Sequence, residues 1–276
     1  MRLEINARTS LCLIIGDPVS HSLSPAMHNA GYATAQVNFV MAGAHVAAQN
    51  LASAVQGART LGIRGLAVTM PHKVAIMPLL DKIDPTAQEI GAVNTVVNDN
   101  GVLTGMNTDW LGILRPLESR AELRGKRVAL LGAGGAALAA LYASVTHGAK
   151  VTIFNRSLEK ARPLAERFGG DVSPLSEAED LSSFDIIINT TSVGMAPDTS
   201  ASPIPQTAIK KHHIVFETIY SPIRTKLLEL SEEVGAQTIP GLEMFLEQGL
   251  AQFQIHTGVK APRQEMENIL RDAFKA

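Results

Sequence analysis

The segment from Val128 to Ala137 has the residue types and spacing needed to bind the phosphates of a dinucleotide. It reads VALLGAGGAA, an apolar run that leads into glycines and then into an Ala/Leu-rich stretch. Gly132, Gly134 and Ala137 match G-x-G-x-x-A, in which the first glycine allows a tight turn and the second lets the backbone approach a pyrophosphate. A helix over 136–147 would direct its N-terminal amides at the phosphates.

A short match of this kind also occurs in ordinary helix–sheet packing, so its context matters. Gly148 ends the expected helix and the β-branched run 151–154 supplies a second strand, which together fit a βαβ unit. The sequence then reads Asn155-Arg156-Ser157, with no carboxylate for the ribose hydroxyls of NAD. Arg156, with Lys160 one helical turn later, can pair with a 2′-phosphate, which favours NADP. The alternative is a solvated arginine at a helix start.

A loop dense in hydroxyl groups, GDPVSHSLSPAMHN, precedes a helix expected to begin near Pro25. In an extended loop Ser22 and Ser24 would lie on one side and could bind a small anion through neutral hydrogen bonds. Alternatively, the two serines cap the helix. No cysteine or carboxylate cluster with ligand spacing accompanies His21 and His28, so a metal site is not expected.

Two ionisable residues follow expected strand ends. An apolar strand over 65–69 ends at Thr69 and Lys73 comes shortly after it, while Asp109 lies between a strand and a helix. Ligands collect at the carboxyl ends of strands in open α/β sheets. On local pattern alone, however, Lys73 could be a surface charge and Asp109 a helix N-cap.

Strands alternating with helices must position these residues. Strands are expected over 11–15, 39–42, 65–69, 91–97, 102–103, 128–131, 151–154, 185–189, 213–217 and 236–239, and helices over 47–61, 74–80, 110–120, 136–147, 158–168 and 224–234 and from residue 241. This alternation predicts an α/β protein of two units, joined through the helix that begins at Trp110. The loop with Thr190 and Ser192 follows the strand 185–189, where it would lie against the nicotinamide half of a dinucleotide.

Bulk composition limits the partners. The 276 residues are 46% hydrophobic and carry a formal net charge of -2, so neither nucleic acid nor an anionic membrane is expected as a partner. The single cysteine, Cys12, lies in an apolar run and fits a reducing compartment. With no signal-peptide core and no apolar stretch of membrane-spanning length, we expect a soluble cytoplasmic protein.

Taken together, these stretches resemble the shikimate dehydrogenase family (shikimate/quinate dehydrogenases) over nearly the whole chain. The motifs with family counterparts are GDPVSHSLSPAMHN, VTMPHK, GAVNTVV, GMNTDWLG, GAGGAA, FNRS, NTTSVGM, IYSPIRTKLL and GLEMFLEQ. The resemblance implies an N-terminal α/β substrate domain (1–109 with 246–276), a Rossmann-type NADP-binding domain (110–245) and a cleft between them. It implies an oxidoreductase that reversibly reduces 3-dehydroshikimate to shikimate with NADPH, in chorismate and aromatic amino acid biosynthesis.

The resemblance also implies roles for individual residues. The substrate-binding residues would be Ser22 and Ser24 at the carboxylate, Thr69, Asn94, Asp109 and Gln248 around the ring hydroxyls, Lys73 at the hydroxyl that is oxidised, and Tyr220 near substrate and nicotinamide. The cofactor-binding residues would be Gly132, Ala133, Gly134, Gly135, Ala136, Asn155, Arg156, Ser157, Lys160, Thr190, Ser192, Gly241 and Met244. Lys73 and Asp109 would be catalytic, because hydride transfer from an alcohol leaves a proton that a lysine beside a carboxylate can move. Which of the two is the formal acid/base stays open.

Four positions depart from the commonest bacterial pattern. Ala67 stands where Asn often does, Glu217 where Asp is usual, Glu243 where Gly is usual and His256 where Trp is frequent. A quinate or dual quinate/shikimate dehydrogenase is therefore the nearest alternative, and a non-catalytic regulatory relative that binds the metabolite is a remote one. The sequence leaves a monomer and a homodimer equally open.

Overall fold

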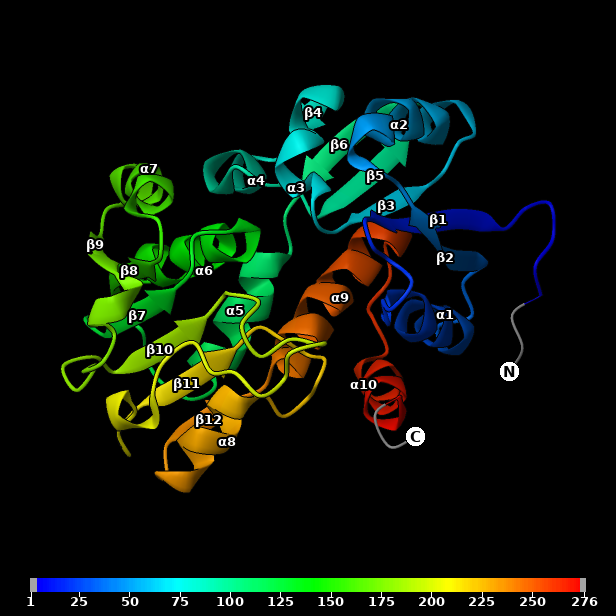
Figure 1. Ribbon diagram of the computed structural model, residues 1–276. Coiled ribbons are helices and arrows are strands. Elements are labelled where there is room, and N and C mark those ends of the chain that lie inside the picture. The colour runs from blue at the N-terminus through cyan, green and yellow to red at the C-terminus, as the bar shows by residue number, and fades with distance from the viewer. Residues whose placement is uncertain (1–3, 274–276) are drawn as a thin grey trace. The chain divides into compact units, whose positions relative to one another are not determined.

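The computed structural model describes residues 4–273, which form two compact units (Figure 1). Unit 1 contains the described residues up to Thr108 together with those from Gln248 onward, and unit 2 contains Asp109–Glu247. The boundaries expected from the sequence lie within two residues of these. The second boundary falls inside one long helix, α9 (Gly241–Thr257).

Unit 1 is built on a six-stranded mixed sheet with the order β2-β1-β3-β5-β6-β4. Its strands are β1 (Ser10–Gly16), β2 (Phe39–His45), β3 (Gly65–Val68), β4 (Lys82–Ile83), β5 (Thr95–Asp99) and β6 (Val102–Met106). Strand β1 is parallel to β2 and β3, whereas β5 is antiparallel to β3 and β6. The expected hairpin between β5 and β6 is confirmed, and its turn residues Asn100 and Gly101 both have positive φ.

Short helices cover this sheet. They are α1 (Ser24–Thr34), α2 (Leu51–Thr60), α3 (His72–Ala75), α4 (Pro85–Ile90) and α10 (Arg263–Asp272), with 3-10 turns η1 (Ala48–Asn50) and η2 (Met77–Leu79). Helix α1 packs against β2 and α10. The single helix expected over 74–80 is wrong, because Pro78 has no N–H with which to continue α3, and the chain forms the separate turn η2.

Unit 2 is a Rossmann-type layer of six parallel strands in the order β12-β11-β10-β7-β8-β9. The strands are β7 (Arg127–Leu131), β8 (Lys150–Asn155), β9 (Asp171–Pro174), β10 (Ile186–Asn189), β11 (Ile214–Glu217) and β12 (Gln237–Ile239). The helices are α5 (Asp109–Glu118), α6 (Gly135–Thr146), α7 (Leu158–Phe168) and α8 (Lys226–Glu233). Two 3-10 turns, η3 (Leu175–Glu177) and η4 (Gln206–Ala208), also occur in this unit. The strand order reverses between β7 and β10. In open parallel sheets this switch point is where ligands bind, at the carboxyl ends of the strands.

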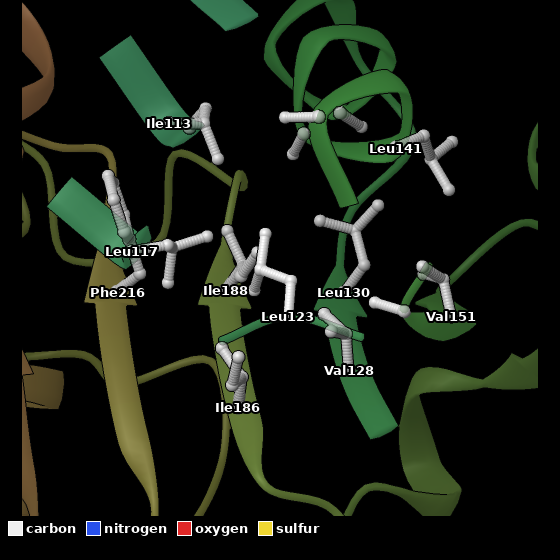
Figure 2. Packing of buried hydrophobic residues seen from close by; sticks show 14 of the residues in the cluster. Ile113, Leu117, Leu123, Val128, Leu130, Leu141, Val151, Ile186, Ile188 and Phe216 are labelled. Atoms are coloured by element: carbon white, nitrogen blue, oxygen red, sulfur yellow. The ribbon is translucent and has the colours of Figure 1, made fainter. Parts of the chain in front are cut away.

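The central strands of unit 2 are buried on both faces. Figure 2 shows Val128 and Leu130 of β7 beside Ile188 of β10, under Leu141 of α6. The alternate residues of β7, among them Ala129, face a second apolar cluster on the other side of the sheet. A run of apolar residues without alternation is therefore required for this strand, as in other parallel sheets.

Candidate active site

The glycine-rich turn lies between β7 and α6, at the switch point of the unit 2 sheet. Gly132 has a φ of +106°, and a Cβ at this position would lie 2.8 Å from Thr190 Oγ1, so conformation and space both require glycine. Gly134, by contrast, is exposed, and a Cβ there would meet nothing within 4 Å. It occupies the N-cap of α6 without a capping side chain. The first backbone N–H groups of a helix have no carbonyl partner within the helix. An open surface beside them fits a dinucleotide pyrophosphate.

Three neighbouring residues are half-buried: Ala133 in this turn, and Gly135 and Ala136 at the start of α6. Ala137 is fully buried, which gives it the packing role that the sequence pattern assigns to the third small residue.

The basic residues lie at the end of the adjacent strand. Strand β8 pairs in parallel with β7 and ends at Asn155, whose Nδ2 donates to Ser157 O at 2.7 Å. Arg156 and Lys160 are both exposed. A turn fixed by the Asn155 amide thus presents the Arg156 guanidinium to solvent at the same sheet edge as the glycine-rich turn, where it can pair with a phosphate.

The loop after β10 is tied to the end of β7. The Thr190 backbone N–H and Oγ1 both donate to Leu131 O, at 2.9 and 2.7 Å. Ser192 is exposed in the same loop. The loop therefore adjoins the glycine-rich turn, as Thr190 beside Gly132 also shows.

The remaining unit 2 residues lie around the start of α9. A Cβ on Gly241 would collide with the Ile219 carbonyl oxygen, so a glycine is required for this close approach, and Met244 is buried one turn later. Tyr220 is half-buried, with its ring centroid 4.7 Å from that of Phe245, and burial raises the pKa of its hydroxyl.

In unit 1 the serine loop differs from the extended conformation expected of it. Leu23, between the two serines, has helical angles (φ -83°, ψ -5°) and is itself the N-cap of α1. Ser24 N donates to Ser22 Oγ at 3.3 Å, and no side chain caps the helix. The prediction of alternating side chains is wrong, because a local hydrogen bond bends the loop before the helix begins.

Thr69 and Lys73 lie just beyond β3. A Cβ on Gly16 would collide with the Thr69 methyl group, so β1 approaches Thr69 closely. Lys73 is half-buried in α3, and its backbone oxygen accepts from Val93 N at 2.8 Å. Both residues are thereby fixed by backbone contacts to neighbouring segments.

Asn94 lies immediately before β5 and is almost fully buried, at 3% exposure. Its Nδ2 donates to Thr108 Oγ1 at 2.9 Å, and its Oδ1 accepts from Thr108 N at 2.7 Å. Val68 N, directly before Thr69, donates to the Asn94 backbone oxygen at 2.7 Å. The segments that carry Lys73, Thr69 and Asn94 are therefore hydrogen-bonded together in unit 1.

Gln252 was not identified from the sequence. It is 2% exposed, and its Nε2 donates to Asn94 O at 3.1 Å and to Thr95 Oγ1 at 2.9 Å. It lies four residues after the buried Gln248, on the same face of α9, and this spacing was the available signal. Asp109, the first residue of α5, is 4% exposed and belongs to unit 2.

Three of the four departures from the family pattern have visible neighbours: Glu217, whose carboxylate accepts hydrogen bonds from three residues, Glu243 and His256. Glu243 forms two hydrogen bonds of 2.7 Å with the guanidinium of Arg120. His256 is fully buried against Gly65, where a Cβ would lie 2.6 Å from its ring. Within residues 4–273, no cluster of His, Cys, Asp and Glu could hold a metal ion, and no helix is long and apolar enough to cross a membrane.

Three family models match the chain in order. They are the shikimate dehydrogenase substrate binding domain over residues 14–96, shikimate / quinate 5-dehydrogenase over 117–200, and the shikimate 5′-dehydrogenase C-terminal domain over 241–271. The shikimate dehydrogenase (NADP(+)) of Moorella thermoacetica is 41% identical, and the alignment covers 99% of this chain and 97% of that protein. This chain belongs to the shikimate dehydrogenase family.

Solved structures of shikimate dehydrogenases and their relatives share the fold. A shikimate dehydrogenase in complex with NADP+ superposes with a TM-score of 0.93 at 38% identity, covering 98% of each chain. A quinate dehydrogenase from Corynebacterium glutamicum in complex with NAD gives 0.89 at 31% identity, covering 96% of this chain and 99% of that one. Fold similarity alone therefore does not separate the two substrates, which must be distinguished by individual side chains.

Proposed function

We propose that this protein is an NADP-dependent shikimate dehydrogenase, an oxidoreductase acting on a CH–OH group. It reversibly reduces 3-dehydroshikimate to shikimate with NADPH, a step of chorismate and aromatic amino acid biosynthesis. The observation that carries this proposal is full-length similarity to a shikimate dehydrogenase (NADP(+)). The exposed Arg156 beside the glycine-rich turn supports the choice of NADP over NAD.

Unit 2 supplies the proposed cofactor site. The backbone of the turn over 132–136 receives the pyrophosphate, and Asn155, Arg156, Ser157 and Lys160 receive the adenosine 2′-phosphate. Thr190, Ser192, Gly241 and Met244 are assigned to the nicotinamide half. Bound NADP supplies the hydride acceptor for shikimate oxidation.

Unit 1 supplies most of the proposed substrate contacts. The hydroxyls of Ser22 and Ser24 donate to the substrate carboxylate, and the side chains of Thr69, Asn94 and Gln248 bind the ring hydroxyls. From unit 2, Tyr220 contributes a phenolic hydroxyl near the reacting carbon. Removal of any of these donors leaves a substrate oxygen without its partner, which costs binding energy.

Lys73 and Asp109 are assigned the proton chemistry. During oxidation, the substrate hydroxyl loses its proton as the carbon loses a hydride, and a lysine amine at the hydroxyl oxygen can accept that proton. In the reverse direction the ammonium donates it and stabilises the developing alkoxide. Asp109 is assigned the role of orienting the lysine and the substrate, and which of the two residues is the formal acid/base stays open.

The rival with a specific observation in its favour is a quinate or dual quinate/shikimate dehydrogenase, since a quinate dehydrogenase has the same fold. Initial velocities with purified protein, crossing shikimate and quinate with NADP+ and NAD+, separate the two. We expect efficient turnover only with shikimate and NADP+. Comparable turnover with quinate or NAD+ would assign the rival function, and no turnover with any pair would favour a metabolite-binding regulator.

Two further expectations accompany this function. The cytoplasmic location inferred from composition stays a prediction, and so does the choice between a monomer and a homodimer. Fractionation of the native source and light scattering of the purified protein would test them.

A further inference from the structure

Unit 2 buries a carboxyl group that the proposed reaction does not use. Glu217 is the last residue of β11 and is 0% exposed. Its partner in register on β10 is Asn189, the last residue of that strand and also 0% exposed. Both side chains therefore lie at the carboxyl edge of the sheet, where the two ligand-binding loops begin.

The Glu217 carboxylate accepts hydrogen bonds from three residues. Asn189 Nδ2 donates to both of its oxygens at 3.0 Å, Ile219 N donates to Oε1 at 3.0 Å, and Thr225 Oγ1 donates to Oε2 at 3.0 Å. Thr225 is the N-cap of α8, and its Oγ1 also accepts from Leu228 N at 3.4 Å. The carboxylate thus joins the end of β10, the segment after β11 and the start of α8.

Asn189 extends these contacts into the loop that carries Thr190 and Ser192. Its Oδ1 accepts from Thr191 N at 3.0 Å and from Thr191 Oγ1 at 2.7 Å. Its backbone oxygen accepts from the N–H and the hydroxyl of Thr218, at 3.1 and 2.8 Å. One buried acid and one buried amide therefore fix the loop after β10 and the segment that leads to Tyr220.

The hydrogen bonds around Glu217 favour its ionised form. Within the described part of the chain, the carboxyl accepts in each of these bonds, and the groups around it, Asn189, Thr218, Ile219 and Thr225, are uncharged. A protonated acid would place an O–H among donors and lose at least one bond. Burial has the opposite and larger effect, because it disfavours the charged form. It raises the pKa of Glu217 from 4.5 to about 7, so the group changes charge near neutrality.

We propose that Glu217, acting through Asn189, is a positioning residue that holds the Thr190–Met195 loop and the Thr218–Tyr220 segment in the conformation that binds the nicotinamide half of NADP. This inference rests on the proposed function, because those segments are assigned to the cofactor and substrate there. Glu217 touches neither ligand. Its effect reaches them through the hydrogen bonds that it and Asn189 make with the loop backbones.

The experiment compares Glu217→Gln with Glu217→Asp. Glutamine keeps the size of the side chain but points an NH₂ group at existing donors, whereas aspartate keeps the charge. Affinity for NADP+ alone is measured by fluorescence titration, and amide exchange of residues 190–195 and 218–220 by mass spectrometry. Ser231→Ala is the matched control, because it removes a different buried hydrogen bond, to Leu227 O at 2.6 Å, in the same unit.

At pH 8.5 we expect Glu217→Gln to bind NADP+ roughly tenfold more weakly and to exchange the loop amides faster, because small displacements of binding groups are costly. Glu217→Asp should stay within about threefold of wild type, and the control should leave affinity and loop exchange unchanged. At pH 5.5 the difference between wild type and Glu217→Gln should disappear, because the wild-type acid is then neutral as well. Titration of the 2′-phosphate cancels in this comparison.

Equal affinity and equal loop exchange in wild type and Glu217→Gln at pH 8.5 would overturn the inference. If Glu217→Gln does not fold, Thr191→Val removes the Thr191 Oγ1–Asn189 bond at a half-buried site and must itself weaken NADP+ binding and speed loop exchange. Neither readout requires turnover. Failure of the wild type to oxidise shikimate would therefore count against the proposed function without deciding the role of Glu217.

Discussion

The loops at the strand ends are held by a neutral side chain in unit 1 and by a charged one in unit 2. In unit 1 the Asn94 amide is hydrogen-bonded to Thr108. In unit 2 the Asn189 amide is hydrogen-bonded to Thr191 in the loop after β10, and it also donates a hydrogen bond to the Glu217 carboxylate. An amide keeps its hydrogen bonds at any physiological pH, whereas a buried carboxyl keeps them only while it is ionised. We therefore expect the loops of unit 2, rather than those of unit 1, to respond to pH near neutrality.

The two units also differ in the titratable groups that they bury. Unit 1 buries His28 and His256, both 0% exposed, whereas unit 2 buries an acid, Glu217, together with a histidine, His213, each also 0% exposed. Burial lowers the pKa of His28 to about 3 and that of His256 to about 4, while it raises the pKa of Glu217 to about 7. In each case burial favours the uncharged form of the side chain in the folded state. The units should consequently differ in how their stability depends on pH.

The largest expected effect tests the assignment of proton chemistry to unit 1. Lys73→Met keeps the length of the side chain but removes the amine, so kcat for shikimate oxidation should fall on the order of 10²–10⁴-fold. Affinity for NADP+ should not change, because the residues proposed to bind the cofactor belong to unit 2. Steady-state kinetics and an NADP+ titration check both points, with Lys82→Met as the control for loss of an exposed lysine in unit 1. A Lys73→Met protein with wild-type kcat would assign the proton transfer to another group.

A second prediction uses the opposite pH dependences of the buried groups His256 and Glu217. Between pH 6.5 and about 4 the unfolded chain binds a proton at His256 that the folded chain does not, so unit 1 loses stability as the pH falls through this range. Glu217 acts in the other direction: its contribution is fully present below pH 4.5 and is lost as the pH rises through about 7. Unit 2 also buries His213, whose pKa burial lowers, but Glu217 offsets its effect there, so acid unfolding should begin in unit 1.

His256→Phe isolates this effect, because it keeps a ring against Gly65 and removes the titratable nitrogens. The variant should lose about 2 kcal/mol less unfolding free energy than wild type between pH 7.5 and pH 5. Hydrogen exchange of the β3 amides and of the α9 amides from Gln248 onward reports unit 1, while fluorescence of the sole tryptophan, Trp110, reports unit 2. His21→Gln, which alters an exposed histidine, is the control. Equal pH dependence in wild type and His256→Phe would contradict the prediction.

Local patterns predicted the parts of the fold that depend on neighbours in sequence. The β7–α6–β8 unit was expected because Gly132 and Gly134 stand at fixed spacing between an apolar strand and an alanine-rich helix. The edge strand β9 (Asp171–Pro174) was missed, since it is four residues long and mostly polar. The conformation around Leu23 was also wrong, because a single side-chain hydrogen bond decides it.

Contacts between distant residues could not be predicted from spacing. Asn189 and Glu217 are 28 positions apart, and Gln252 and Asn94 are 158 apart. No sequence pattern states that two strand ends are neighbours in a sheet, so the Glu217 carboxylate was visible only as a departure from the usual Asp. The sequence could therefore assign each candidate site residue to a strand, helix or loop. The side chains that hydrogen-bond those segments to one another became visible only in the structure.

A third prediction concerns the exposed Arg156 of unit 2 and has an expected effect of similar size. Arg156→Gln removes the guanidinium proposed to pair with the 2′-phosphate, and a hydrogen bond to a charged group contributes about 1.5–3 kcal/mol, so KM for NADP+ should rise roughly 10- to 100-fold. KM for NAD+ should stay nearly constant, because NAD lacks that phosphate, and shikimate affinity should be unchanged if the substrate contacts lie mainly in unit 1. Arg224→Gln removes another exposed positive charge of unit 2, just before α8, and controls for the loss of charge as such. Parallel losses with NADP+ and NAD+ in Arg156→Gln would mean that this arginine stacks on the adenine common to both, and cofactor preference would then depend on Lys160.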